Sequence, residues 1–176
     1  MKTNVALIGF MGAGKTAVGE VLAEKLNKKF AELDSFIEQK AGKSIPEIFE
    51  QHGEVAFREL EIEATKEIAS QKNLVIACGG GIVLNKINID RLRNESIMVY
   101  LTASPRILLK RILSDEDDRP VLKGSDKALN IQKLLKFRKP FYERAADIKI
   151  NTSKLDINSV VEQIIEKLKE DEGFHS

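Results

Sequence analysis

The segment Gly9–Thr16, which reads GFMGAGKT, directly follows the apolar run Val5–Ile8 and fits the pattern G-x-x-x-x-G-K-[ST]. Glycines let the backbone curl so that successive N–H groups point at phosphate oxygens. The lysine of the pattern reaches the β- and γ-phosphates, and its hydroxyl residue can ligate Mg²⁺. A helix that begins here directs the positive end of its dipole at the same anion. The segment therefore predicts a nucleoside triphosphate site, with the phosphates held by Gly12, Ala13, Gly14, Lys15, Thr16 and Ala17 and the metal ion held by Thr16.

Composition is that of a compact soluble enzyme. The chain has 176 residues, which is the length of one domain, and its 28 Lys and Arg residues nearly balance 27 Asp and Glu residues. This balance argues against nucleic acid or a membrane surface as a partner. The single cysteine, Cys78, excludes an intrachain disulfide, and two histidines are too few for a Cys/His zinc site. No apolar run approaches the length of a membrane span. We expect a cytoplasmic protein and a monomer.

Apolar and amphipathic segments alternate along the chain. Strands are expected at Val5–Ile8, Lys29–Leu33, Leu74–Cys78, Ile97–Leu101 and Ile148–Ile150. Helices are expected at Lys15–Leu26, Glu54–Gln71, Pro105–Leu113, Ile131–Arg144 and Ile157–Lys169. This alternation predicts an α/β fold in which helices cover both faces of a parallel sheet. Ligands of such sheets bind at the carboxyl ends of the strands.

Two stretches interrupt the alternation, and we expect neither to contribute to the core. Residues 34–53 hold short helical patterns around Gly42 and Pro46, and residues 114–125 are a charged segment without apolar periodicity. A charged segment of this kind is commonly a solvated loop. Its place after the fourth expected strand favours instead a lid that closes over a bound nucleotide.

Motifs that the sequence lacks argue against two classes of nucleotide-dependent protein. It contains no D-x-x-G element of a regulatory GTPase, and the segment 85–88, NKIN, is only a near match to the N-K-x-D base-binding motif. A motor ATPase would end a strand in an acidic residue, whereas the expected strand Leu74–Cys78 is followed by Gly79, Gly80 and Gly81. Three glycines allow another molecule to approach the backbone closely. This arrangement favours a second, small substrate.

Six elements, in order, make the chain similar to the shikimate kinases, which are P-loop small-molecule kinases related to nucleoside monophosphate kinases. They span roughly residues 5–165. They are the phosphate loop Gly9–Thr16, Asp34 with Ile37 and Glu38, the segment Gly53–Glu61 (GEVAFRELE), the triple glycine Gly79–Gly81, Arg119-Pro120 with Leu122, and Arg138 with Pro140 and Tyr142.

The resemblance implies a three-layer α/β/α P-loop kinase fold with a five-stranded parallel sheet of order 2-3-1-4-5. Residues 1–176 would form one domain, with a substrate-binding region at about 33–61 and a lid at about 112–125. The implied reaction is ATP- and Mg²⁺-dependent phosphorylation of the 3-hydroxyl group of shikimate.

The resemblance also implies roles for individual side chains. Arg58 and Arg138 would bind the carboxylate of shikimate, because a guanidinium group matches carboxylate oxygens geometrically. Asp34 would accept hydrogen bonds from ring hydroxyl groups and orient the one that attacks, with removal of its proton left open, and the backbone of the triple glycine would contact the rest of the substrate. Lys15 would bridge the phosphates, and Arg119 would add a positive charge from the closed lid in the transition state.

At three positions the chain departs from the family pattern or matches it only in part. Glu32 stands where the family usually has an Asp associated with water-mediated Mg²⁺ contact, so we expect Glu32 to contact the metal ion through water. Cys78 stands where a hydroxyl residue commonly precedes the triple glycine. Arg111 matches the arginine that packs on adenine, but the opposing loop, residues 151–155, lacks the proline often found there.

Simpler interpretations of these residues remain open at this point. Arg58 could form only a surface ion pair with Glu61, Arg138 could be one more surface charge, and Asp34 could cap the helix that follows it. For the whole chain, the alternatives are another small polyol or sugar-acid kinase, such as a gluconate kinase, and a nucleotide-binding regulatory protein without transfer activity.

Overall fold

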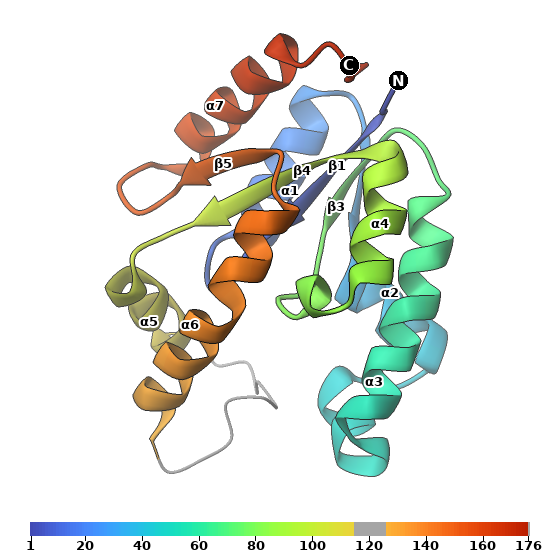
Figure 1. Cartoon of the computed structure of the whole chain (residues 1–176), viewed down its shortest axis with the longest axis vertical. Helices are drawn as coiled ribbons and strands as arrows, with labels where there is room; N and C mark the ends of the chain where they lie inside the picture. The colour runs from blue at the N-terminus through green and yellow to red at the C-terminus, as the bar shows by residue number, and fades with distance from the viewer. Residues whose placement is uncertain (115–125, 176) are drawn as a thin grey trace.

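The computed structural model describes residues 1–114 and 126–175 (Figure 1). The segment 115–125, which contains Arg119 and most of the expected lid, lies outside the described residues.

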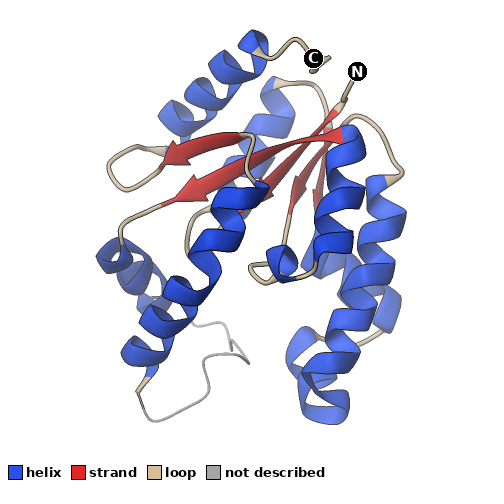
Figure 2. Ribbon diagram, viewed as in Figure 1, coloured by secondary structure: helices blue, strands red, loops and turns tan. Residues whose placement is uncertain are grey.

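A parallel five-stranded sheet forms the centre of the fold (Figure 2). Its strands are β1 (Asn4–Ile8), β2 (Lys29–Glu32), β3 (Leu74–Ala77), β4 (Ser96–Thr102) and β5 (Ile148–Asn151). Their order is β2-β3-β1-β4-β5, and the expected fold class is thereby confirmed. Val5 at the centre of β1 pairs with Val75 on one side and Ile97 on the other. The residues of β1 and β3 are all buried, as expected for strands covered on both faces.

Helices cover both faces of the sheet (Figures 1 and 2). They are α1 (Lys15–Lys25), α2 (Leu33–Ala41), α3 (Ile45–Ala69), α4 (Lys86–Glu95), α5 (Pro105–Ser114), α6 (Lys127–Ala145) and α7 (Ile157–Glu170), with a short 3₁₀ turn η1 at Ile82–Leu84. Helix α1 packs against α7, α3 packs against α4, and α4 and α6 contact β4. Figure 1 shows α3 on one side and α5 and α6 on the other, extending past the carboxyl ends of the strands.

The prediction that residues 34–53 do not contribute to the core is wrong. This stretch forms most of α2 and the first part of α3, and it buries Ile37 and Ile48 almost completely. Helix α2 begins at Leu33, so the second strand is one residue shorter than expected. Signals for the start of α3 are present in the sequence, because Ser44 and Glu47 form a capping box in which each accepts a hydrogen bond from the other's backbone.

Helix α3 is bent at Gly53, where the backbone is non-helical with φ 80° and ψ 177°. Residues with a β-carbon rarely adopt this positive φ value, so the position requires glycine. The bend separates the first two turns of α3 from the longer part that carries Phe57, Arg58 and Glu61. Both parts can therefore face the same space beyond the sheet.

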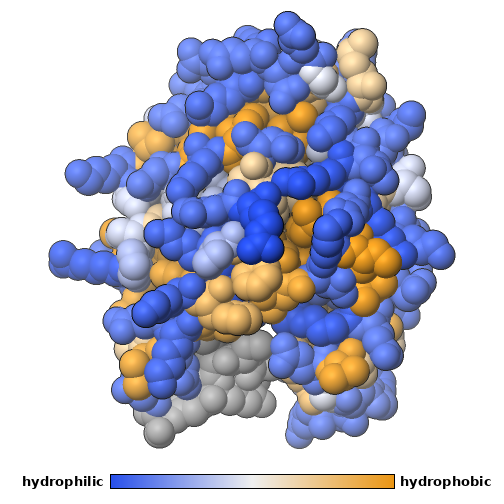
Figure 3. All heavy atoms as spheres, viewed as in Figure 1, coloured by the Kyte–Doolittle hydropathy of each residue, from blue (hydrophilic) through white to orange (hydrophobic). Residues whose placement is uncertain are grey.

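Two further elements differ from the sequence expectations. Helix α4 was not predicted from the sequence. It buries only a few residues, among them Ile89 and Leu92, so its apolar periodicity is weak. The sequence from Lys169 to Ser176 predicts a solvated tail, but Phe174 within it forms a β-bridge with Lys2 and packs against the core. Within residues 1–114 and 126–175, no helix is long and apolar enough to cross a membrane. Figure 3 shows hydrophilic side chains over most of one face, with hydrophobic atoms exposed between them.

Candidate active site

The phosphate loop joins β1 to α1 and ends in a helix N-terminus without a side-chain cap. Gly14 is the N-cap residue and has φ 92°, which only glycine adopts readily. The first N–H groups of a helix have no partner within the helix. Here those groups belong to Lys15, Thr16 and Ala17, so the loop presents backbone donors where the sequence predicts a phosphate.

The ammonium group of Lys15 lies on the loop itself. Its Nζ atom donates hydrogen bonds to the carbonyl oxygens of Gly9, at 2.7 Å, and Phe10, at 3.0 Å. These contacts hold the positive charge next to the backbone donors of the loop. A negatively charged group bound in the loop would meet both.

Thr16 and Glu32 are joined directly. The Thr16 hydroxyl donates a hydrogen bond of 2.8 Å to Glu32 Oε1, and the Ser35 hydroxyl donates one of 3.4 Å to Oε2. Because its proton is donated to Glu32, the Thr16 oxygen keeps lone pairs for a cation. Hydroxyl and carboxylate oxygens are the donors that Mg²⁺ prefers, so these residues fit that ion.

Asp34 lies in the first turn of α2, not at the end of the strand before it. The N-cap of α2 is Glu32, so the interpretation of Asp34 as a capping residue is not supported. Asp34 Oδ1 is shielded from water and accepts no hydrogen bond within the described residues. Burial raises the pKa of this carboxyl group, and the positive charge of Lys15 partly opposes that shift. A carboxylate with a raised pKa is a better proton acceptor than an exposed one.

Arg58 does more than form an ion pair on the surface. Its guanidinium group contacts Glu61 at 3.1 Å and Glu54 at 3.2 Å, and Glu61 is only 1% exposed. Burial raises the pKa of Glu61, while Arg58 lowers it. Arg138 is 3% exposed, so the interpretation of this residue as a surface charge is wrong. The Arg58 side chain, which is 21% exposed, and the buried Arg138 side chain therefore both lie at the carboxyl edge of the sheet.

The triple glycine explains how these charged groups fit together. A β-carbon at Gly79 would lie 2.8 Å from Asp34 Oδ1, and one at Gly81 would lie 2.6 Å from both terminal nitrogens of Arg58. At Gly80 it would lie 3.3 Å from a terminal nitrogen of Arg138. A side chain at any of the three glycines would collide with, or crowd, one of the three side chains expected to bind substrate. Each glycine therefore leaves room for one of them.

This geometry leads to a prediction for Gly81→Ala. The new methyl group meets the flexible end of Arg58, so the guanidinium group should move aside and the fold should survive. Loss of a charge-assisted hydrogen bond costs about 1.5 to 3 kcal/mol, so the KM for the carboxylate-bearing substrate should rise at least about tenfold. Kinetics and a thermal melt test this together. A large fall in Tm, or an unchanged KM, would contradict the interpretation.

A cavity of about 790 Å³ connects the phosphate loop to these groups. The sequence-predicted residues that line it are Gly12, Gly14, Lys15, Thr16, Ala17, Glu32, Asp34, Arg58, Gly79, Gly80, Gly81 and Arg138. Ala13 and Arg111 do not line it, and Arg119 lies outside the described residues. Cys78 also faces the cavity, and burial raises the pKa of its thiol to about 12, so the thiol is neutral at pH 7. A smaller hollow of about 490 Å³ lies on another face of α3.

Arg111 binds the loop that follows β5. It donates hydrogen bonds to the backbone oxygen of Gly12 at 3.2 Å and to the hydroxyl and carbonyl oxygens of Thr152 at 3.3 and 3.2 Å. It thereby connects the phosphate loop to the segment 151–155 named in the sequence analysis. Arg111 and the segment 151–155 are the two groups between which the resemblance places the nucleotide base.

Part of the cavity wall lies within the expected substrate-binding region 33–61, but its individual residues were not assigned as site residues from the sequence. Ser35 and Glu38 line it from α2, and Ile45, Pro46 and Phe49 line it from the first turns of α3. Phe49 packs on Phe57 with ring centroids 4.9 Å apart, and the guanidinium group of Arg58 lies 5.1 Å from the Phe57 ring centroid. The capping box that precedes Ile45 could have identified this helix. Nothing in the sequence indicates that its aromatic face turns toward the phosphate loop.

The sheet order and the phosphate loop between β1 and α1 define the chain as a protein of the P-loop kinase fold. A family model described as shikimate kinase matches residues 11–169. The shikimate kinase of Caldanaerobacter subterraneus is 45% identical over 162 residues, covering 92% of this chain and 94% of that one. That of Caldicellulosiruptor bescii is 43% identical over 162 residues, covering 92% and 93% of the two chains. The chain belongs to the shikimate kinase family.

Solved structures agree with this assignment. The shikimate kinase of Acinetobacter baumannii, determined in complex with shikimate, superposes with a TM-score of 0.92 at 36% identity, covering 98% of this chain and 96% of that one. The enzyme of Aquifex aeolicus gives a TM-score of 0.82 at 34% identity, with 94% and 96% covered.

Proposed function

We propose that this chain transfers the γ-phosphoryl group of ATP to the 3-hydroxyl group of shikimate. One observation carries the proposal: Asp34, Arg58 and Arg138 converge on the triple glycine inside the same cavity as the phosphate loop. The relatives named shikimate kinases and the A. baumannii structure with bound shikimate support it.

The acceptor side of the site fits a hydroxylated carboxylic acid. Arg58 and Arg138 supply two guanidinium groups for one carboxylate, and a planar fork can bind both of its oxygens. Asp34 supplies the acceptor for a hydroxyl proton, because its Oδ1 atom is buried without a hydrogen bond from the described residues. With the carboxylate fixed at one end, one ring hydroxyl group is presented to Asp34 and to the phosphates.

On the donor side, phosphoryl transfer mainly requires positioning and positive charge around the moving group. The backbone donors of Lys15, Thr16 and Ala17 orient the phosphates, and the Lys15 ammonium group balances their charge. Arg119 would add a further cation from a lid at about residues 112–125. Arg111 and the segment 151–155 would hold the adenine.

Mg²⁺ would be held by Thr16 directly and by Glu32 through water. When bound, the ion would neutralise phosphate charge. The role of this chain's residues is to orient the ligand: Glu32 accepts the hydrogen bond from the Thr16 hydroxyl group, so the hydroxyl oxygen would keep its lone pairs for the cation.

Glu32→Gln should weaken metal use. The amide can still accept a hydrogen bond from Thr16, but it loses the charge that favours a hydrated cation, and such outer contacts typically change metal affinity about 10- to 100-fold. We expect the Mg²⁺ concentration for half-maximal activity to rise by about tenfold, with the KM for shikimate unchanged. A Mg²⁺ titration at saturating ATP measures this. Glu32→Asp is the charge-preserving control, and equal effects of both variants would contradict the role.

The whole of residues 1–176 would act as one domain and as a monomer in the cytoplasm. Its substrate-binding region would be residues 33–61, which include α2 and α3 as far as Glu61.

The decisive experiment is product analysis with ATP and Mg²⁺ in the presence of shikimate, gluconate or no acceptor. We expect ATP consumption that depends on shikimate and yields shikimate 3-phosphate. Consumption that depends on gluconate would favour a sugar-acid kinase. Nucleotide binding without turnover on any acceptor would favour a regulatory protein.

A further inference from the structure

A buried tyrosine lies against the triple glycine from the side of α6. Tyr142 is fully buried, and its hydroxyl group donates a short hydrogen bond to the carbonyl oxygen of Gly80. Burial also raises the pKa of this hydroxyl group, so it stays protonated and remains a donor at any physiological pH. The contact joins two segments that are 62 residues apart in the chain.

Tyr142 and Arg138 act on the same glycine. They are four residues apart on α6, a spacing that places two side chains on one face of a helix. Arg138 lies 3.3 Å from the place where a β-carbon of Gly80 would be, and the Tyr142 hydroxyl group binds the carbonyl of the same residue. The guanidinium group and the glycine backbone are therefore set relative to each other by one helix.

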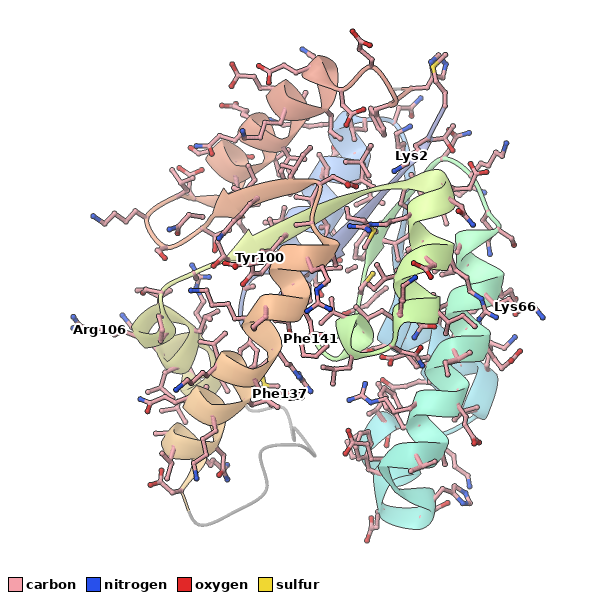
Figure 4. All side chains as sticks on the ribbon, viewed as in Figure 1. Lys2, Lys66, Tyr100, Arg106, Phe137 and Phe141 are labelled. Carbon is pink, nitrogen blue, oxygen red and sulfur yellow. The ribbon has the colours of Figure 1, made fainter. Side chains whose placement is uncertain are left out.

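The ring of Tyr142 is itself held from the sheet. It stacks on Tyr100, with centroids 5.2 Å apart and the planes 23° apart. Tyr100 belongs to β4, where α6 passes over that strand (Figure 4). The hydroxyl group of Tyr142 thus extends from a packed, rigid base and not from a flexible side chain.

Three consecutive glycines lack this rigidity. Each glycine has access to far more backbone conformations than other residues, and ordering it costs more entropy. A peptide group is planar and trans, so fixing the Gly80 carbonyl also fixes the direction of the Gly81 N–H on the opposite side. One hydrogen bond from Tyr142 can therefore orient the backbone edge that lines the cavity between Arg58 and Arg138.

We infer that Tyr142 is a positioning residue that holds the Gly80–Gly81 peptide and Arg138 in the geometry that binds the acceptor substrate. The inference rests on the proposed function, because it assigns the residue to the shikimate half of that site. Tyr142 does not touch the reacting atoms. Its loss should affect acceptor binding and leave nucleotide binding unchanged.

The test compares Tyr142→Phe with Tyr100→Phe. These are the only two tyrosines in the chain, they stack on each other, and each variant removes one hydroxyl group while keeping the ring. The Tyr100 hydroxyl group interacts with Thr102 and not with the triple glycine, so this variant controls for lost stability. For Tyr142→Phe we expect a roughly tenfold rise in the KM for shikimate with the KM for ATP unchanged, because a buried hydrogen bond is lost. For Tyr100→Phe we expect both KM values to stay within about twofold.

The outcomes separate the inference from a structural role. A fall in Tm for both variants with no change in the shikimate KM of Tyr142→Phe would overturn the inference, as would equal KM changes in both. Wild-type turnover on shikimate is measured first and tests the proposed function alone. Absence of that turnover would overturn both proposals, whereas its presence with an unchanged Tyr142→Phe would overturn only this one.

A second measurement observes Tyr142 with its hydroxyl group still present. In the Tyr100→Phe background, incorporation of 3-fluorotyrosine labels Tyr142 alone, since no other tyrosine remains. We expect its ¹⁹F resonance to shift on titration with shikimate and to respond more weakly to ADP. A resonance that ignores shikimate while the enzyme is saturated with it would also overturn the inference.

Discussion

Asp34→Asn is expected to lower kcat by about two to four orders of magnitude, the usual contribution of a positioned general base. The amide keeps the size of the carboxyl group and can still accept a hydrogen bond from a substrate hydroxyl group. It cannot take a proton. Because Oδ1 of Asp34 is buried and accepts no hydrogen bond within the described residues, the substitution should not unfold the protein. Shikimate binding should weaken only slightly, so the loss should appear in kcat.

Glu38→Gln is the matched control for this substitution. Glu38 lies one turn further along α2 and lines the same cavity, and its charge contributes to the raised pKa of Asp34. Removing it takes away a carboxylate of the same wall without removing the proton acceptor. We expect kcat to change by less than about threefold. Near-normal turnover of Asp34→Asn, or an equal loss in Glu38→Gln, would show that Asp34 does not take the proton.

The fold and the donor half of the site could be predicted because local patterns determine them. Strand β1, the phosphate loop and α1 are contiguous, so the apolar run, the glycines and the following helix indicate one another. The alternation of strands and helices requires a parallel sheet. The order of its strands came from resemblance alone, since the alternation does not say which strands are neighbours.

The acceptor half depends on contacts between distant segments. Arg58 needs the space at Gly81, and Asp34 needs the space at Gly79. These needs become visible only when α3 and α2 are placed against the end of β3. The hydrogen bond from Tyr142 to Gly80 likewise has no local signal. Sequence reasoning could name the residue types that a hydroxy acid requires. It could not show that each glycine serves a particular charged side chain.

The bend in α3 and the start of α6 are two further features that the sequence pattern did not predict. Helix propensity alone does not indicate that the helix over residues 45–69 bends at Gly53, because a glycine within a helix can also be tolerated without a bend. Helix α6 begins four residues earlier than expected, because the Asp126 side chain accepts a hydrogen bond from the Leu129 N–H. Both features place residues that line the cavity, Phe49 on one side and Arg138 on the other.

Arg138→Lys is expected to raise the KM for shikimate by about thirty- to a thousandfold, which corresponds to about 2 to 4 kcal/mol for losing a buried, hydrogen-bonded charge contact. Lysine keeps the positive charge, but it offers a point charge where the guanidinium group offers a planar fork. The KM for ATP should stay within about twofold, since Arg138 lies against Gly80 at the acceptor end of the cavity.

Arg138 is almost fully buried, so its removal could disturb packing as well as binding. Arg138→Lys is therefore preferred to Arg138→Ala, and Arg144→Lys serves as the control on the same helix because its guanidinium group lies over the Phe141 ring and does not line the cavity. If ATP binding weakened and shikimate binding did not, the assignment of the two halves of the cavity would be reversed. If Arg138→Lys and Arg144→Lys behaved alike, the carboxylate would be bound by Arg58 alone.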